Sequence, residues 1–414
     1  MRHLYLLRRL LSAIAAVLLF TQASSSYAVP SFARQTGLQC SSCHSAYPQL
    51  TAFGRQFKMQ GYTLAGGDMG KVNNSGFSPL ATAPISLMIQ ATWSGIKKAP
   101  DANTDSSQVD LPAQLSLFYA GRITDKLGAF AQITAEQGQS FSQDNTDIRY
   151  ADQTRLGDKP LTYGVTLNNN PTVQDPWNST PVWSFPWFEA GYGYETPDTL
   201  ISSLGGSVAG LTAYGFWNNH IYAEAGGYQA SNTGADLSAN AIDNTAPYWR
   251  FAYTSDAGSL NWMVGTFGLD GNVFDLSEQT ASITDTGLDT QLQWMLANAQ
   301  TLTLDASYIH EAQPHSEHLN NSMVNLTWYF DATWGVSAGY RGTSSSSHAL
   351  APDDNYRWSD AGKLNSDAYQ LQLDFVPWLN TRFALQYTAY AKLNGTSAHA
   401  SDSNQLMLGA WLVF

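Results

Sequence analysis

The sequence predicts an all-β fold: a sixteen-stranded transmembrane β-barrel of the outer-membrane type, preceded by a small N-terminal plug segment. Charged residues make up only 13% of the 414-residue chain and aromatic residues another 13%, whereas about 25% of a typical soluble domain is charged. No stretch after residue 30 has the roughly 20 consecutive apolar residues that a transmembrane helix needs. From residue 85 onward the chain instead alternates apolar and polar residues, as strands with one lipid-facing side do.

Residues 1–28 have the three parts of a secretory signal peptide. Arginines stand near the N-terminus, an apolar run follows, and a small-x-small site ends at Ala28. The apolar run is too short to span a bilayer stably, so we expect cleavage after Ala28 and export.

The chain is acidic, with 20 basic and 33 acidic residues and a net charge of −13. Cleavage of the signal peptide would remove three arginines and no acidic residue, which makes the mature chain more acidic still. Such a charge repels nucleic acid and attracts cations. We therefore expect no nucleic-acid partner.

The only two cysteines, Cys40 and Cys43, are followed directly by His44 in a C-x-x-C-H motif. In an exported protein this spacing is the attachment signature of c-type haem, since two thiols bond to the porphyrin and the next residue offers its imidazole to the iron. The alternatives are a disulfide, a thioredoxin-like redox pair and half of a zinc site. A zinc site would need more ligands nearby, and a redox pair would need a βαβ context. The motif therefore predicts one covalent haem c.

Residues 29–84 form the expected haem-binding segment, but they are too few to build an independent haem domain with its own core. Leu50, Phe53 and Phe57 have helical spacing, so a short helix could cover one face of the haem. The lumen of a barrel could cover the other face, and we expect the segment to lie inside the barrel. Three basic side chains either neutralise the haem propionates or are ordinary surface charges: Arg34, Arg55 and Lys58.

The distal iron ligand has several candidates. Met59 and Met69 are close enough in sequence to fold back over the haem, and methionine ligation raises a reduction potential. Either methionine could instead fill a gap in the packing. Of the two, Met59 is preferred as the metal ligand. A residue from the barrel such as His220, or an open site, is the remaining alternative.

Residues 85–414 are predicted to form the barrel. A terminal strand ending on Phe414 is typical of outer-membrane proteins, and the alternative is a soluble all-β periplasmic protein with a haem tail. Short and long connections alternate, except that the long segment 168–186 falls where a short turn is expected. Either a pair of strands is missing, or this segment folds into the lumen or against the plug, which we prefer. The predicted strands are 85–94, 111–123, 127–137, 161–167, 187–194, 208–217, 220–229, 246–254, 259–268, 286–296, 301–310, 321–331, 334–342, 366–376, 381–392 and 404–414.

Two runs of sequence resemble a known family. They are PSFARQTGLQCSSCH at 30–44, continuing through FGR at 53–55, and NNNPTVQDPWNSTPVW at 168–183. They resemble the fused monohaem cytochrome c–porin family of bacterial outer membranes, which includes iron-oxidising outer-membrane cytochromes. The resemblance implies a sixteen-stranded barrel that holds one haem on Cys40, Cys43 and His44. It also implies electron transfer from extracellular Fe(II) to a periplasmic acceptor, either a c-type cytochrome or a copper protein.

Two other functions remain open from the sequence: a porin with a redox-responsive haem plug, and a conduit for a non-iron electron donor. Outer-membrane lipid is a partner in each case, and iron(II) oxidation is the enzymatic activity under consideration. A group of metal-type side chains falls in a predicted loop, although a solvated polar loop is the preferred interpretation of it. The group is His310, Glu311, His315, Glu317 and His318.

Overall fold

The computed structural model describes most of the chain after residue 29. The predicted signal peptide and Met69 lie outside the described residues. No helix in the described part of the chain has the length and apolar character needed to cross a membrane. The described residues are 30–46, 49–63, 83–99, 105–181, 187–188, 198–231, 242–275, 277, 279–298, 300–352, 358–360, 363–378 and 380–414.

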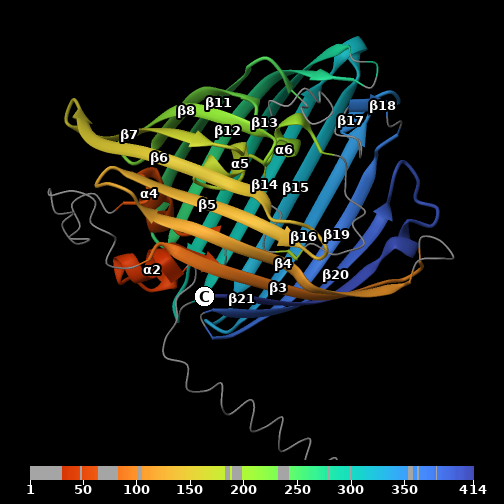
Figure 1. Cartoon of the computed structure of the whole chain (residues 1–414), viewed down its shortest axis with the longest axis horizontal. Helices are drawn as coiled ribbons and strands as arrows, with labels where there is room; N and C mark the ends of the chain where they lie inside the picture. The colour runs from red at the N-terminus through yellow and green to blue at the C-terminus, as the bar shows by residue number, and fades with distance from the viewer. Residues whose placement is uncertain are drawn as a thin grey trace, which may run out of the picture.

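Sixteen antiparallel strands form a closed barrel (Figure 1), so the predicted fold class is confirmed. Each strand pairs with the next barrel strand, and the last strand, β21, pairs with the first, β3. The barrel strands are β3 (Ile85–Ile96), β4 (Ser107–Arg122), β5 (Leu127–Glu136), β6 (Ser142–Leu156), β7 (Lys159–Asn168), β8 (Val208–Trp217), β9 (Ile221–Ala230), β11 (Ala246–Ala257), β12 (Leu260–Phe274), β13 (Thr280–Met295), β14 (Thr301–Ala312), β15 (His318–Tyr329), β16 (Trp334–Ser345), β19 (Ser366–Trp378), β20 (Thr381–Lys392) and β21 (Gln405–Val413).

The remaining described elements are short. They are α2 (Pro30–Thr36), α3 (Cys40–Cys43), β1 (His44–Ala46), β2 (Gln49–Leu50), α4 (Ala52–Met59), α5 (Pro171–Gln174), α6 (Leu200–Ser203), β10 (Ile242–Asp243), η3 (Pro314–Ser316), β17 (Leu350–Pro352), β18 (Trp358–Asp360) and η4 (Ala400–Ser403).

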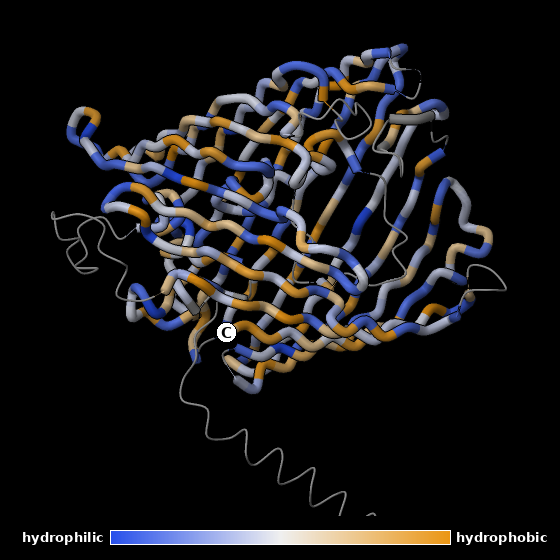
Figure 2. The backbone as a smooth tube through the Cα atoms, in the orientation of Figure 1, coloured by the Kyte–Doolittle hydropathy of each residue, from blue (hydrophilic) through white to orange (hydrophobic). Residues whose placement is uncertain are grey.

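Side chains alternate between the outer and inner faces of the wall, as the pleat of a strand requires. On β11, Trp249 and Phe251 are exposed on the outside, whereas Arg250 and Ala252 are buried inside. Figure 2 shows the resulting alternation of hydrophobic and hydrophilic residues along the strands. The exposed apolar residues of the outer face are suited to lipid.

The two ends of the barrel differ. We call the end with turns such as 123–126 and 157–158 the turn end, and both the start of β3 and the end of β21 lie there. We call the opposite end, which carries connections such as 169–207 and 346–365, the loop end. In Figure 1, α2 lies near the turn end and β17 and β18 lie at the loop end.

The strand β6 is absent from the strands that the sequence predicts. Its inward-facing side chains include Asn145, Asp147 and Arg149, all buried. These polar and charged groups hide the alternation on which a strand prediction depends. They are stable inside the barrel because they bond to one another and to the segments that fill the lumen.

The predicted strand 187–194 is wrong. Trp187 and Phe188 are not in a strand, residues 189–194 lie outside the described part, and β7 pairs directly with β8. The aromatic residues of this segment suggest a lipid-facing strand, but Trp187 and Phe188 are buried. One missed strand and one false strand leave the total at sixteen. Because β6 adds one more crossing of the barrel wall, the connection 169–207 lies at the loop end and not at the turn end that the sequence predicts. Long connections are expected at the loop end.

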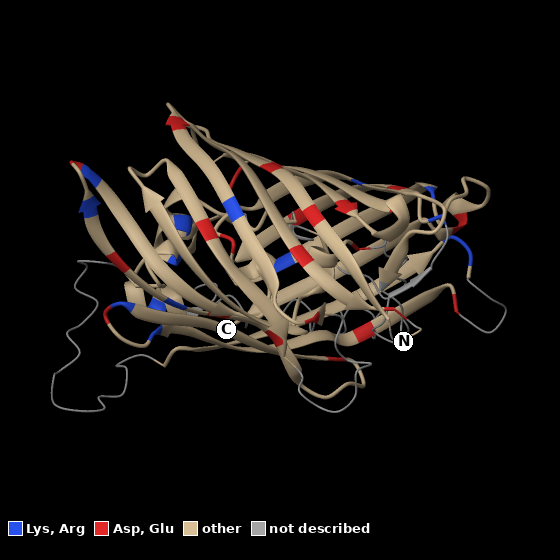
Figure 3. Ribbon diagram, turned by 90° about the horizontal axis from the view of Figure 1, so that it is seen from above, with Lys and Arg blue, Asp and Glu red and all other residues tan. Residues whose placement is uncertain are grey.

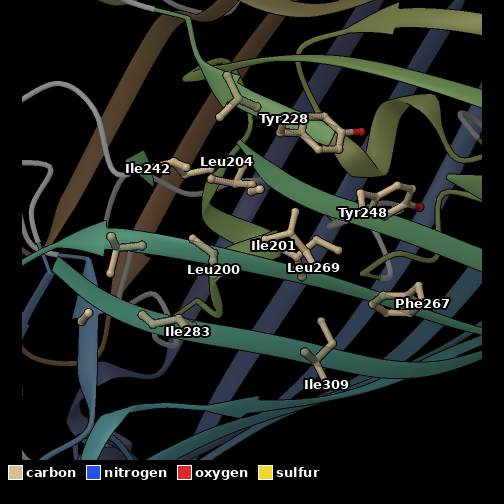
Figure 4. Packing of buried hydrophobic residues seen from close by; sticks show 14 residues of the cluster. Leu200, Ile201, Leu204, Tyr228, Ile242, Tyr248, Phe267, Leu269, Ile283 and Ile309 are labelled. Carbon is tan, nitrogen blue, oxygen red and sulfur yellow. The ribbon is translucent and has the colours of Figure 1, made fainter. Parts of the chain in front are cut away.

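The described parts of the connection 169–207, here called the inner loop, fold into the lumen. Leu200 and Ile201 of α6 donate their backbone N–H groups to Glu311 and Asp285, at 2.5 and 2.7 Å. Figure 4 shows the apolar side chains of α6 packed against residues of β9, β11, β12, β13 and β14, including Phe267. This position agrees with the preferred interpretation of the segment that broke the predicted alternation.

Charged residues are sparse along the strands (Figure 3), and several buried ones form ion pairs inside the barrel. Burial of an ion pair is tolerated when both groups are hydrogen-bonded, and removal of one partner is costly. The pairs are Arg149–Asp147 at 2.9 Å, Arg250–Asp175 at 3.1 Å, Arg250–Asp289 at 2.6 Å and Arg382–Asp374 at 2.8 Å.

Candidate functional site

The described residues of the N-terminal segment, 30–46 and 49–63, lie at the turn end, against the inside of the wall. Arg34 of α2 donates from Nη2 to the carbonyl oxygen of Ile85 at 2.6 Å, which fastens the helix to the first strand. Phe32 of α2 stacks on Tyr62, with ring centroids 5.4 Å apart. The chain before and after the cysteine motif is therefore held together by an aromatic contact.

The cysteine motif lies between α2 and α4. Cys40 and Cys43 are the first and last residues of α3, and His44 begins β1, which pairs with β2 and returns the chain to α4. Thr51 joins the two helices: its backbone N–H donates to Cys43 O at 2.8 Å, and its Oγ1 donates to Ser42 O at 2.7 Å. The three predicted attachment residues are therefore fixed on one short turn.

Gly54 allows α4 to approach α3 closely. A Cβ atom at this position would lie 2.2 Å from the carbonyl oxygen of Cys43. Any other residue would force the two helices apart. The FGR run that contributes to the family resemblance thus contains a glycine with a steric role beside the motif.

Arg55 anchors α4 to the barrel wall. Its Nη1 donates to Leu50 O and to Gln291 Oε1, each at 2.6 Å, and its Nη2 donates to Asn261 Oδ1. Burial lowers the pKa of Arg55 to about 10, although Asp305 opposes that shift. The side chain is buried against β12 and β13, so Arg55 is not an ordinary surface charge.

Lys58 joins α4 to the inner loop. Its ammonium group donates to the carbonyl oxygens of Val173 and Asp175, the second at 3.0 Å. Burial, and then the charge of Arg149, lowers the pKa of Lys58 to about 8. Two segments more than a hundred residues apart in the sequence are thereby locked together inside the barrel.

A cavity of about 860 Å³ lies beside these segments, within the range of cofactor-sized pockets. Cys40, Cys43 and His44 line it at the turn end. Apolar side chains surround this part of the cavity and could cover a porphyrin face. They are Phe32, Leu38, Leu50 and Phe57 from the N-terminal segment and Met88, Phe118, Phe130 and Trp411 from the wall.

The donor set fits a c-type haem. The structure holds Cys40 and Cys43 as thiols, not as a disulfide. Burial, and then the neighbouring Cys40, raises the pKa of the Cys43 thiol to about 11, so this thiol is protonated at neutral pH. Two thiols and an imidazole thus line one cavity whose other walls near them are mainly apolar.

The structure does not bring Met59 to this cavity. Its side chain is buried on the other side of α4, in a cluster with Trp177 and Met263, and its carbonyl oxygen accepts a hydrogen bond from Tyr214 at 2.5 Å. His220 lies in the β8–β9 turn, where its ring stacks on that of Tyr253. Neither residue is among those that line the cavity.

Met88 is the one methionine among the described lining residues, and it is missing from the candidates that the sequence predicts. It faces inward from β3 at 4% exposure, between the inward-facing Ser86 and Gln90. An apolar side chain in an otherwise polar inward register is a signal that the sequence contains. The signal can be interpreted only once the fold places Met88 on the cavity that the cysteine motif also lines.

The loop histidines do not form a metal centre. Glu311 is buried and bonded to α6, whereas the ring of His310 is exposed and lies 2.7 Å from Asn320 Oδ1. The rings of His310 and His318 are 6.2 Å apart. No group of three potential metal ligands occurs among the residues that the structure describes.

Comparisons with known proteins bear on the barrel. No protein-family model and no curated protein matches the sequence. Similar solved structures include the outer-membrane channel DcaP of Acinetobacter baumannii, 11% identical with a TM-score of 0.50, where the match covers 82% of this chain and 99% of that one. OmpF of Salmonella typhi, in complex with daunomycin, is 13% identical with a TM-score of 0.49 and coverage of 80% and 98%. OmpT of Vibrio cholerae is 9% identical with a TM-score of 0.48 and coverage of 82% and 99%.

The chain therefore has a porin-like β-barrel fold, as predicted. At this level of identity the likeness concerns the fold alone. The predicted haem and its electron-transfer role depend on the motif and the cavity of this chain.

Proposed function

We propose that this protein is an outer-membrane monohaem c-type cytochrome–porin that passes electrons between the two sides of the membrane. Cys40 and Cys43 would hold the haem through thioether bonds, and His44 would bind its iron. The observation that best supports this assignment is the position of the three residues on one cavity inside the barrel. An outer membrane has an apolar band of roughly 25 Å, and a redox centre inside the barrel would divide that distance.

A bound haem would supply one-electron transfer at its iron, with a potential that depends on the axial ligands and on burial. The chain's own residues provide position and cover. Thr51 and Gly54 hold α3 against α4, and Arg55 and Lys58 fix α4 to the wall and the inner loop. These contacts would keep the attachment site rigid, which limits reorganisation during electron transfer.

We further propose that the electron donor is extracellular Fe(II) and that a periplasmic c-type cytochrome or copper protein accepts the electron. The acidic composition supports a cationic donor. The family resemblance supports iron. Oxidation inside a barrel that opens outward would also keep the poorly soluble ferric product out of the cell.

Anaerobic mixing of the purified protein with Fe(II), followed by haem absorbance, tests this function. We expect the oxidised haem to become reduced. Haem staining after denaturing electrophoresis tests the attachment, because thioether bonds survive unfolding. The stain should disappear in the Cys40→Ser, Cys43→Ser double variant, and a stain that persists there would overturn the assignment. A haem that stays oxidised with Fe(II) but is reduced by another physiological donor would move the proposal to a non-iron conduit.

A second candidate function is a porin whose haem segment is a redox-responsive plug. The porin-like fold and a cavity that reaches exposed residues at the loop end favour it. Swelling of vesicles that contain the protein, measured with a small neutral sugar, separates the two functions. Flux that changes between oxidised and reduced protein would support the plug, whereas no flux in either state would support the conduit.

A further inference from the structure

We propose that the cavity is a cation-selective entry path, through which small hydrated cations from the loop end reach the cysteine motif. The path depends only on the barrel and its contents. Its use by the electron donor rests on the proposed function. The path would set the class of the donor, namely a small hydrated cation such as a divalent transition-metal ion.

The cavity extends from the motif to the loop end. Its lining begins at Cys40 and His44, passes along the inner faces of β3, β4 and β5, and ends at the β5–β6 connection. Gln139 and Gln143 line that end, and both are exposed. Asn170 and Gly205 of the inner loop also line the cavity. A solute at the loop end thus has a continuous path toward the motif.

Amide side chains dominate the middle and outer parts of the lining. They are neutral, and each both donates and accepts hydrogen bonds. Such a surface can exchange hydrogen bonds with a hydrated ion without removing its water. The glutamines that line the cavity are Gln39, Gln90, Gln108, Gln114, Gln132, Gln137, Gln139 and Gln143.

Three carboxylates line the same path: Asp110, Glu136 and Asp144. Asp110 accepts hydrogen bonds from Gln108 at 3.0 Å and Thr92 at 3.3 Å, and both donors are neutral. Glu136 accepts a hydrogen bond from Gln139, and Asp144 accepts hydrogen bonds from Thr134 and Asn145, so these donors are neutral as well. Within the described part of the chain, none of the three forms an ion pair.

Other acids in the lumen contrast with these three. Asp147, Asp175, Asp289 and Asp374 are each paired with a buried arginine. Among the described lining residues, the only lysine or arginine is Lys58, at the turn end, where it donates hydrogen bonds to backbone carbonyl oxygens. Unlike these four acids, the three carboxylates of the path have no ion-paired cation among the described residues.

This distribution of charge gives the path a negative electrostatic potential. Uncompensated charges in a cleft with low-dielectric walls focus the field and raise the local concentration of counter-ions by about 10- to 1,000-fold. Screening at physiological salt acts over about 8 Å, so the effect is confined to the cavity and its mouth. Cations would be concentrated near the motif, and anions would be excluded.

Thiol modification tests the path without requiring a haem. In the Cys40→Ser, Cys43→Ser background, Gln114→Cys places a single thiol on the cavity lining between Asp110 and Phe118. Its reaction with a cationic and an anionic methanethiosulfonate of similar size is followed by mass spectrometry. We expect the cationic reagent to react at least about tenfold faster. Equal rates, or a thiol that reacts with neither reagent, would overturn the proposal. Heat-modifiable electrophoretic mobility confirms that each variant is a folded barrel.

Charge variants supply the matched control. Asp110→Asn, Glu136→Gln and Asp144→Asn together should reduce the ratio of the two rates to near one. Asp125→Asn, Asp158→Asn and Asp331→Asn remove the same charge from the turn end and should leave the ratio unchanged. A ratio that falls equally in both triple variants would show an effect of net charge alone and would overturn the path.

Stopped-flow reduction of the haem protein tests the donor's use of the path. Hexaammineruthenium(II), a cation, should reduce the haem faster than the anionic Fe(II)–EDTA chelate, and the first triple variant should lose most of that preference. A thiol preference without a matching preference in haem reduction would keep the cation path but overturn its role for the donor. Failure of haem attachment would overturn the proposed function and leave the thiol result standing.

Discussion

Single residues beside the motif determine whether α3 and α4 can form one attachment site. Gly54 has the sharpest requirement, because the carbonyl oxygen of Cys43 occupies the space that a side chain would need. Thr51 then joins the two helices by hydrogen bonds from its backbone and its hydroxyl group. The proposed haem site therefore depends on residues that would not themselves contact iron.

Gly54→Ala is expected to reduce haem attachment several-fold while the barrel still folds. The added methyl group must displace α4 from α3, and overpacking of this kind costs about 1–3 kcal/mol. Haem stain per folded protein is the measurement. Gly215→Ala is the control, because its Cβ would meet only Leu161, at 3.6 Å. Full haem content in the Gly54 variant would show that the helices can separate without loss.

Met88→Leu tests whether Met88, on the cavity lining, is a ligand of the proposed haem iron. We expect a lower reduction potential in this variant, because methionine ligation raises the potential. The shift should exceed about 60 mV, which is a tenfold change in the equilibrium constant of a one-electron couple. Met59→Leu should leave the potential nearly unchanged, since Met59 lies in a different cluster. A redox titration followed by haem absorbance measures both. A larger shift for Met59 than for Met88 would contradict the position of the two side chains.

The sequence alone predicts some residues of the candidate site and misses others. Cys40, Cys43 and His44 can be predicted because covalent attachment fixes their spacing within five residues. A distal ligand has no such constraint, and proximity in the chain points to Met59. Met88 reaches the cavity through the closure of the barrel, a contact between segments that the local pattern does not encode.

At the scale of elements, β6 and the inner loop explain both errors in the predicted strand order. β6 has a polar inner face because that face binds the lumen contents: Arg149 donates to Gln174 O at 2.5 Å, and Asp147 accepts from Tyr62 at 2.6 Å. The inner loop contains aromatic residues because it packs inside the barrel. Alternation of apolar and polar residues indicates a strand with one side toward lipid. A prediction that depends on this alternation fails for elements whose partners lie in the lumen.

Arg250→Ala is expected to release the inner loop. The substitution leaves Asp175 and Asp289 buried without their cation, and breaking a buried ion pair costs about 3–5 kcal/mol. We expect faster proteolysis of the inner loop and a lower free energy of unfolding in detergent. Lys126→Ala, which breaks the exposed pair with Asp152, is the control and should change little. An inner loop as protected as in the wild type would show that apolar packing alone holds it.

At the scale of the whole molecule, the two ends of the barrel lumen differ in what occupies them. The described part of the N-terminal segment lies at the turn end, and the cavity opens among exposed residues of the loop end. A donor outside the cell and an acceptor in the periplasm require the loop end to face outward. The strand count alone supports this orientation, since both the start and the end of the barrel lie at the turn end.

Cysteine labelling on intact cells tests the orientation. In the Cys40→Ser, Cys43→Ser background, Ser106→Cys at the loop end should react with a membrane-impermeant maleimide. Asp158→Cys at the turn end should react only after the outer membrane is permeabilised. Both sites are exposed, so accessibility within the barrel does not separate them. The reverse pattern would place the cavity mouth in the periplasm and exclude an extracellular donor.

The pairing of β3 with β21 has a consequence for assembly. The N-terminal segment precedes β3, yet it bonds to β12 and β13, which lie across the barrel from that pairing. The inner loop bonds to the same side of the wall, through Asp175 to Arg250 of β11 and through Ile201 to Asp285 of β13. If the wall closed first, both segments would have to be threaded through an end of a finished cylinder. In an open, curved sheet, the two segments can instead pack against the inner face from the side. The first and last strands then pair and close the barrel. The seam between β3 and β21 would then be the last part of the molecule to form, with the interior already in place.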